Sequence, residues 1–152
     1  YKRQDIGYAQ SNRERYEGFC QALMDAGKTP NPSLCLTTPL GIDSYREEID
    51  SFLSSLSRMP DAFVCASDYV ACILMQLLEK RGLRVPEDVA VSGFDNNIED
   101  LLAENLTTVQ VFNEELGSRL ALQILYRIKY PHTPHEVTYL ESKVLYRAST
   151  GD

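Results

Sequence analysis

The sequence has too little positive charge to hold nucleic acid on a surface of its own. It contains 15 Lys and Arg against 22 Asp and Glu, a formal net charge of −7 at pH 7, whereas phosphate recognition depends on clustered basic residues. It also lacks any apolar run near the roughly 20 residues that span a bilayer. No apolar signal-peptide core follows residues 1–5. We therefore expect a cytoplasmic protein that contacts neither membrane nor DNA directly.

Metal and disulfide motifs are also missing. The four cysteines, at positions 20, 35, 65 and 72, include no Cys-x-x-Cys pair, so buried reduced thiols are expected. His132 and His135 are separated by two residues in a proline-flanked loop, but no carboxylate or thiol stands nearby at metal-ligand spacing. We read the two histidines as solvated and predict neither metal nor cofactor.

The clearest positive signal is a strand, helix and strand between residues 59 and 95. An apolar run at 62–66 predicts a strand buried on both faces, and a second run at 89–94 predicts its parallel neighbour. Between them Ser67 or Asp68 can cap a helix that stops near Gly82 and carries an apolar stripe at helical spacing: Val70, Ile73, Leu74, Leu77 and Leu78. Polar residues follow both strands, at 67–68 and 95–97. Since such sheets bind ligands beyond the carboxyl ends of their strands, this unit predicts a small-molecule site.

The rest of the chain continues the alternation. Ser-x-x-Glu capping boxes at 11–14 and 44–47 predict helices to Gly27 and to about residue 57, with a strand at 33–37 between them. A strand at 106–111, a helix from Asn113 and a long strand or hairpin at 137–147 follow. At 152 residues and 43% hydrophobic content, the chain has the size of one ordinary domain. The predicted fold is α/β, three-layer αβα, with an open and mainly parallel sheet.

Several motifs, in one order along nearly the whole chain, resemble the effector-binding domain of the lactose-repressor and galactose-repressor family of bacterial transcription regulators. They are Ser11-x-x-x-Arg15-x-x-Gly18-Phe19, the block 60–68 with Ala71, the block 82–95, Leu106-Thr107-Thr108-Val109, Leu116-Gly117 and Arg147-Ala148-Ser149-Thr150. The resemblance implies a periplasmic-binding-protein-like fold: two α/β subdomains that hold a small effector, usually a sugar or nucleobase, in the cleft between them.

By this resemblance the chain is a fragment. Residues 1–95 and 137–152 would form the C-terminal subdomain, and residues 106–130 would return to the N-terminal one. The helix-turn-helix that reads operator DNA would lie outside this sequence. Members of the family usually dimerise through C-terminal-subdomain helices, here including 69–81, so a homodimer is expected.

The resemblance also suggests the effector site. Arg15 would hold ligand oxygens, although an exposed helix arginine is the simpler alternative. Asp68 would accept hydrogen bonds from hydroxyls, a role compatible with helix capping. Ser11 could cap or contact the ligand. The family places a stacking residue near 38–40, but no aromatic stands there, and Asp95 falls at the hinge and cleft edge. The candidate residues are Arg15, Asp68, Ser11, Ser67, Thr38, Pro39, Leu40 and Asp95.

These expectations favour a sensor that binds a sugar-like effector and alters operator binding by an attached domain. Two alternatives stay open: a non-regulatory sugar-binding module, and an α/β enzyme using Asp68 or Asp95. The sequence has no phosphate loop or nucleophile elbow to support the enzyme. If the other subdomain is absent, the stripe of Leu116, Leu120, Ile124 and Leu125 must be covered by the chain's own sheet or in a dimer.

Overall fold

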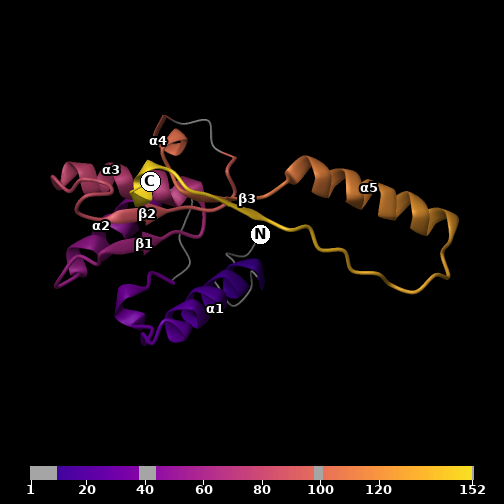
Figure 1. Ribbon diagram of the computed structural model, residues 1–152, viewed down its shortest axis with the longest axis horizontal. Helices are drawn as coiled ribbons and strands as arrows, with labels where there is room; N and C mark the ends of the chain where they lie inside the picture. The colour runs from indigo at the N-terminus through magenta and orange to yellow at the C-terminus, as the bar shows by residue number, and fades with distance from the viewer. Residues whose placement is uncertain (1–9, 38–43, 98–100, 152) are drawn as a thin grey trace.

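The computed structural model describes residues 10–37, 44–97 and 101–151. It shows a compact part built around β1, β2, α2 and α3, from which α5 and its return segment project as a long arm (Figure 1). In chain order the elements are α1 (Gln10–Asp25), η1 (Pro32–Leu34), α2 (Tyr45–Ser55), β1 (Ala62–Val64), α3 (Asp68–Lys80), β2 (Ala90–Ser92), α4 (Leu101–Glu104), β3 (Thr108–Gln110), α5 (Asn113–Lys129), β4 (Lys143–Leu145) and η2 (Ala148–Thr150).

The predicted strand, helix and strand are confirmed. β1 and β2 pair in parallel, with Phe63 opposite Val91, and α3 connects them. Isolated parallel bridges, Ser92 to Thr107 and Asp95 to Gln110, extend the pairing toward β3. β3 in turn pairs with β4 in the antiparallel sense. The chain is therefore α/β, with its parallel strands at the centre of the compact part.

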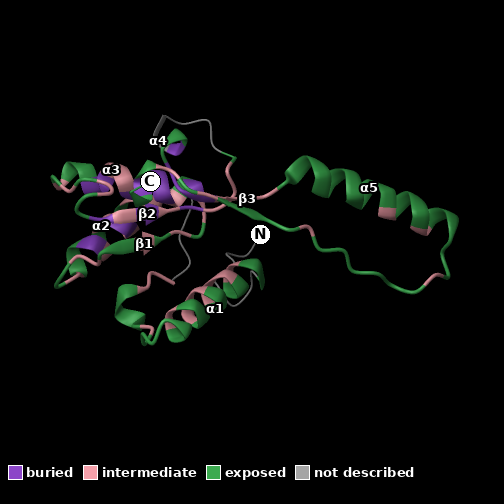
Figure 2. Cartoon of the chain, in the orientation of Figure 1, coloured by how far each residue is buried: buried purple, intermediate pink, exposed green. Residues whose placement is uncertain are grey.

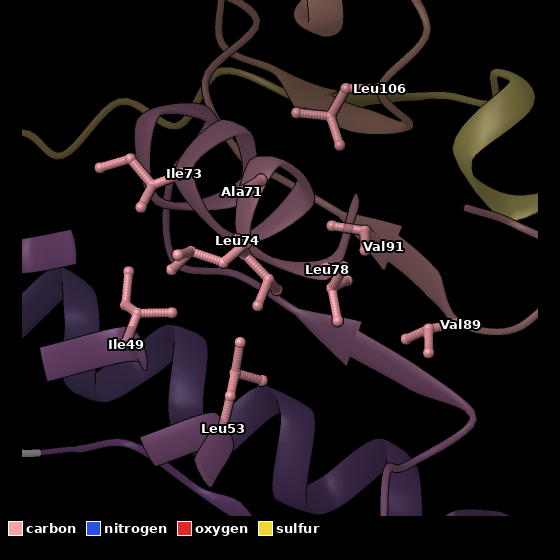
Figure 3. Close-up of a cluster of buried hydrophobic side chains, with 10 residues drawn as sticks. Ile49, Leu53, Ala71, Ile73, Leu74, Leu78, Val89, Val91 and Leu106 are labelled. Carbon is pink, nitrogen blue, oxygen red and sulfur yellow. The ribbon is translucent and has the colours of Figure 1, made fainter. Parts of the chain in front are cut away.

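α3 supplies half of the residues of the core cluster. Its apolar stripe packs against residues from α2, from β2 and its start, and against Leu106, two residues before β3. Figure 3 shows these side chains converging from separate elements. The core cluster consists of Ile49, Leu53, Ala71, Ile73, Leu74, Leu77, Leu78, Val89, Val91 and Leu106. α3 ends as predicted, because Gly82 adopts φ +75° and the Leu83 amide donates to the Leu78 carbonyl at 3.0 Å.

The prediction that β1 is buried on both faces is wrong. Phe63 packs against the core, but Ala62 and Val64 on the other face are exposed, Val64 at 63%. In Figure 1, α1 lies on the side of β1 away from α3, yet α1 contains no buried residue. One face of β1 is thus sealed by helices, and the other face stays accessible.

Two local predictions before β1 are also wrong. Residues 33–37 form no strand: the Asn31 side chain accepts from the Ser33 amide at 3.0 Å, and Pro32 starts a short 3-10 turn instead. Ser11 does not cap α1, since the helix already includes Gln10, whose side-chain amide donates to the Glu14 carboxylate. Ser44 does stand at the N-cap of α2, but its hydroxyl donates to Glu48 and it makes no side-chain capping bond.

The long strand predicted at 137–147 is reduced to β4. β3 has only three paired residues, so residues 137–142 have no strand beside them in the described chain. They run instead along the arm opposite α5 (Figure 1). Gln123 on α5 donates to Thr138 at 3.0 Å, which ties the two sides of the arm together.

α5 buries none of its 17 residues. Figure 2 shows the arm almost wholly in the colour of exposed residues, in contrast to the compact part. Leu116, Leu120, Ile124 and Leu125 are between 48% and 63% exposed. The expectation that this stripe docks on the chain's own sheet is therefore wrong, while its burial in a dimer stays a prediction.

Candidate functional site

Arg15 reaches from α1 to the carboxyl edge of the parallel strands. Its Nη1 donates to the carbonyl of Ala66, just beyond β1, at 2.7 Å. Its Nη2 lies 3.5 Å from Asp95 Oδ1, just beyond β2, and its guanidinium carbon lies 3.8 Å from the centre of the Phe94 ring. The structure thus brings two of the predicted site residues, Arg15 and Asp95, together at the edge where such sheets bind ligands.

Both side chains remain accessible. The Arg15 side chain is 30% exposed and that of Asp95 26%. A guanidinium has five N–H donors in a rigid fork, and the contacts to Ala66 and Asp95 use only part of that capacity. The pair can therefore offer both donors and acceptors to a ligand with several hydroxyl groups.

Asp95 sits in an unusual turn. Asp95 and Asn96 have φ of +110° and +51°, values that residues with a Cβ seldom adopt. The Asp95 amide donates to the Val109 carbonyl at 2.9 Å, and Asn96 Oδ1 accepts from Arg147 at 2.8 Å. Burial raises the pKa of Asp95 above its usual value, although the Arg15 charge acts to lower it. The turn links the candidate site directly to β3.

Ser67 and Asp68 have separate roles. Ser67 is the N-cap of α3, and its hydroxyl accepts from the Val70 amide at 3.4 Å. Asp68 is only 2% exposed, and its Oδ1 accepts from the Thr108 hydroxyl at 2.6 Å. Since that carboxyl group points into the protein, its position favours a supporting role over direct ligand contact.

The other predicted residues are less informative. Ser11 is exposed on α1, four residues before Arg15 and hence on the same helix face. Thr38, Pro39 and Leu40 lie outside the described residues.

No role was predicted for the residues that join the segment after β4 to β2 and to the segment before β3. Ser149 donates to the Val91 carbonyl at 2.6 Å and accepts from the Thr107 amide at 2.8 Å. Arg147 donates to the carbonyls of Ala103 and Leu106 at 3.1 and 3.0 Å. The motifs 106–109 and 147–150 contained these residues, but their mutual contact depends on a fold that brings the two ends of the arm together.

The thiols and acidic groups of the described residues form no metal-binding cluster. None of the four cysteines, all of which lie in the described part of the chain, forms a disulfide. Burial raises the pKa of Cys65 to about 12, which makes it a poor nucleophile. Within residues 10–37, 44–97 and 101–151, no three His, Cys, Asp or Glu side chains are placed to hold a metal. No helix in that described part is long and apolar enough to cross a membrane.

Comparison with known proteins gives the same picture. The profile of the periplasmic binding protein-like domain matches residues 4–150. The HTH-type transcriptional repressor PurR of Photobacterium profundum is 28% identical over 92% of this chain and 42% of its own length. A LacI-family regulator from Sanguibacter keddieii has a TM-score of 0.81 at 29% identity, over 93% of this chain and 53% of that one. The regulator CelR in complex with cellobiose has a TM-score of 0.79 at 30% identity, over 91% of this chain and 42% of that one.

The chain belongs to the family of periplasmic binding protein-like domains. Within it, the chain matches the effector-binding domain of lactose-repressor-type transcription regulators, as its motifs predicted. It spans about 42% of the length of the first of these curated relatives.

Proposed function

We propose that this chain is the ligand-sensing part of a longer cytoplasmic transcription regulator, and that it binds a small, hydroxyl-rich effector, such as a sugar. The observation that carries the proposal is the accessible Arg15 and Asp95 pair at the carboxyl edge of β1 and β2. Ser67 and Ser11 are the neighbouring candidates for ligand contact, and Thr38, Pro39 and Leu40 complete the proposed set. We propose no catalytic role for Asp68 or Asp95, because the relatives that the chain matches are transcription regulators.

An effector regulates only if it binds one arrangement of the protein more tightly than another. The Asp95 turn connects the candidate site to the arm, since its backbone bonds to β3 and β3 leads into the arm. We propose that effector binding at Arg15 and Asp95 changes the position of the arm relative to the compact part.

The exposed arm is an argument for a second subdomain. We propose that residues 106–130 belong with a subdomain outside this chain, which would cover the exposed apolar face of α5. Operator DNA would be read by a further domain, since a net charge of −7 gives this chain no surface for phosphates. The complete regulator would act as a homodimer.

The test is ligand-induced stabilisation. A panel of sugars that includes ribose and cellobiose is added to the purified chain, to Arg15→Ala and to the control Arg13→Ala. Arg13 lies on the same helix and pairs with Glu17, away from the strand ends. At a concentration of 100 times Kd a sugar stabilises the fold by about 2.7 kcal/mol, which raises Tm by several degrees.

We expect the shift in the parent chain and in Arg13→Ala but not in Arg15→Ala. An equal shift in all three would contradict the assigned site. Chemical conversion of the sugar during incubation would contradict the sensor and favour the enzyme.

A further inference from the structure

We propose that Asp68 is a positioning residue of the effector site: together with Thr108 it forms a buried lock that fixes the turn whose carbonyl holds Arg15. This inference rests on the proposed function, in which Arg15 contacts the effector. The lock is the hydrogen bond between the side chains of Asp68 on α3 and Thr108 on β3, two residues that lie 40 apart in sequence.

The lock is enclosed on all the sides the structure describes. Asp68 is 2% exposed and Thr108 1%. The Thr108 hydroxyl donates to Asp68 Oδ1 at 2.6 Å, the short distance typical of a hydrogen bond to a carboxylate. A Cβ on Gly93 would lie 2.2 Å from the same oxygen. Glycine at this position therefore leaves the room that the carboxyl group occupies.

The backbone around Asp68 carries this constraint to the site. The Asp68 amide donates to the Phe94 carbonyl at 2.9 Å, and the Cys65 amide donates to the Ser92 carbonyl at 2.8 Å. The turn between these two anchors contains Ala66, whose carbonyl accepts from Arg15. Phe94, whose carbonyl accepts from the Asp68 amide, also supplies the ring under the guanidinium. The backbone of Asp68 is thus bonded next to Ala66 and Phe94, the residues that make two of the three contacts to Arg15.

A purely structural role would make a different prediction. If Asp68 and Thr108 only add stability, breaking their bond lowers the melting temperature and leaves Arg15 where it is. If they position the turn, the same change releases the Ala66 carbonyl and the Arg15 guanidinium becomes free to rotate. The two roles are therefore separated by a measurement on Arg15 itself.

The experiment follows the exchange of the Arg15 guanidinium protons with water by nitrogen-15 NMR, with the signal assigned by its loss in Arg15→Lys. Thr108→Val removes the hydroxyl and keeps the shape of the side chain, whereas Thr108→Ser keeps the hydroxyl. Ile49→Val shortens a core side chain on α2 and serves as the control for lowered stability.

We expect exchange at Arg15 to become about tenfold faster or more in Thr108→Val, because a buried carboxylate without its donor drives the turn open. Thr108→Ser and Ile49→Val should stay close to the parent chain. Unchanged exchange in a folded Thr108→Val would overturn the proposal, whatever its melting temperature.

If Thr108→Val does not fold, Asp68→Asn replaces it, since the amide keeps an acceptor oxygen of similar shape. A neutral acceptor holds the hydroxyl more weakly, so exchange at Arg15 should rise about threefold, and no rise would overturn the proposal. Because this readout needs no sugar, it is independent of the panel that tests the proposed function. A panel without any binding sugar, combined with faster Arg15 exchange, would refute the sugar sensor and leave the positioning role intact.

Discussion

α3 and α5 both carry an apolar stripe at helical spacing, but the stripe of α3 is buried and the stripe of α5 is exposed. α3 has 13 residues, of which Asp68, Ala71, Cys72, Ile73, Leu74, Leu77 and Leu78 are buried. α5 has 17 residues, none of them buried. The stripe on α3 meets α2 and β2, whereas the stripe on α5 faces solvent in this chain. A helical pattern thus identifies the face that needs a partner but does not say whether the chain supplies one.

The largest expected effect is the difference in free energy of unfolding between two matched leucine truncations, one on α3 and one on α5. Leu78 on α3 is fully buried and Leu120 on α5 is 56% exposed. Leu78→Ala should lower the free energy of unfolding by about 2–5 kcal/mol, since it leaves a cavity in the core. Leu120→Ala should change it by less than about 0.5 kcal/mol, as expected at an exposed position.

Urea denaturation followed by circular dichroism at 222 nm measures both variants. Equal losses would mean that the α5 stripe is covered in solution, for instance in a dimer. Light scattering on the same samples would then show twice the mass of the chain.

A smaller loss is expected at Gly93, where the compact part meets the site. A Cβ there would lie 2.2 Å from Asp68 Oδ1 and 2.8 Å from Leu106 Cδ2. Gly93→Ala should therefore destabilise the chain by about 1–3 kcal/mol, the usual range for overpacking.

Gly117→Ala on α5 is the control, because a Cβ there meets no atom within 4 Å. In a helix interior alanine is favoured over glycine by roughly 0.5–1 kcal/mol. Thermal melts should show opposite signs for the two variants. A neutral Gly93→Ala would mean that Asp68 is not held where the structure places it.

The smallest effect is expected at Asp95, on the edge of the compact part. Burial raises the pKa of its carboxyl group, more than the Arg15 charge lowers it. A folded pKa above the unfolded value means that the ionised group costs stability at neutral pH and that this cost disappears as the pH falls through the folded pKa.

Asp95→Asn should therefore raise stability slightly at pH 7, by less than about 0.5 kcal/mol. The gain should vanish near pH 3, where the parent carboxyl group is protonated. Melting curves at pH 7, 5 and 3 measure the trend. A lower melting temperature for Asp95→Asn at pH 7 would show that the ion pair with Arg15 outweighs burial.

Local patterns predicted the compact part well. The stripe on α3, the cap at Ser67 and the stop at Gly82 are each determined by residues close in sequence, and each is confirmed. The motif resemblance predicted that Arg15 binds the effector, and the structure places its side chain at the strand ends. Its contact with an effector stays a prediction.

What the sequence could not show depends on distant contacts. Asp68 accepts a hydrogen bond from Thr108, 40 residues later, and its position at a strand end did not reveal this contact. The predicted contact of Asp68 with an effector stays a prediction. The strand expected at 33–37 required a neighbouring strand, and the local turn around Asn31 and Pro32 prevailed without one. The exposure of β1 likewise depends on how closely α1 packs against it, which the sequence of α1 did not reveal.

Amide hydrogen exchange on α3 and α5 tests most directly whether one part of this chain is complete and the other is not. In the chain alone, we predict that the amides of α3 exchange only through global unfolding, while those of α5 exchange far faster through local opening. In a longer protein that includes the remaining length of its relatives, α5 should become protected to the level of α3. Equal protection of both helices in the chain alone would contradict this division.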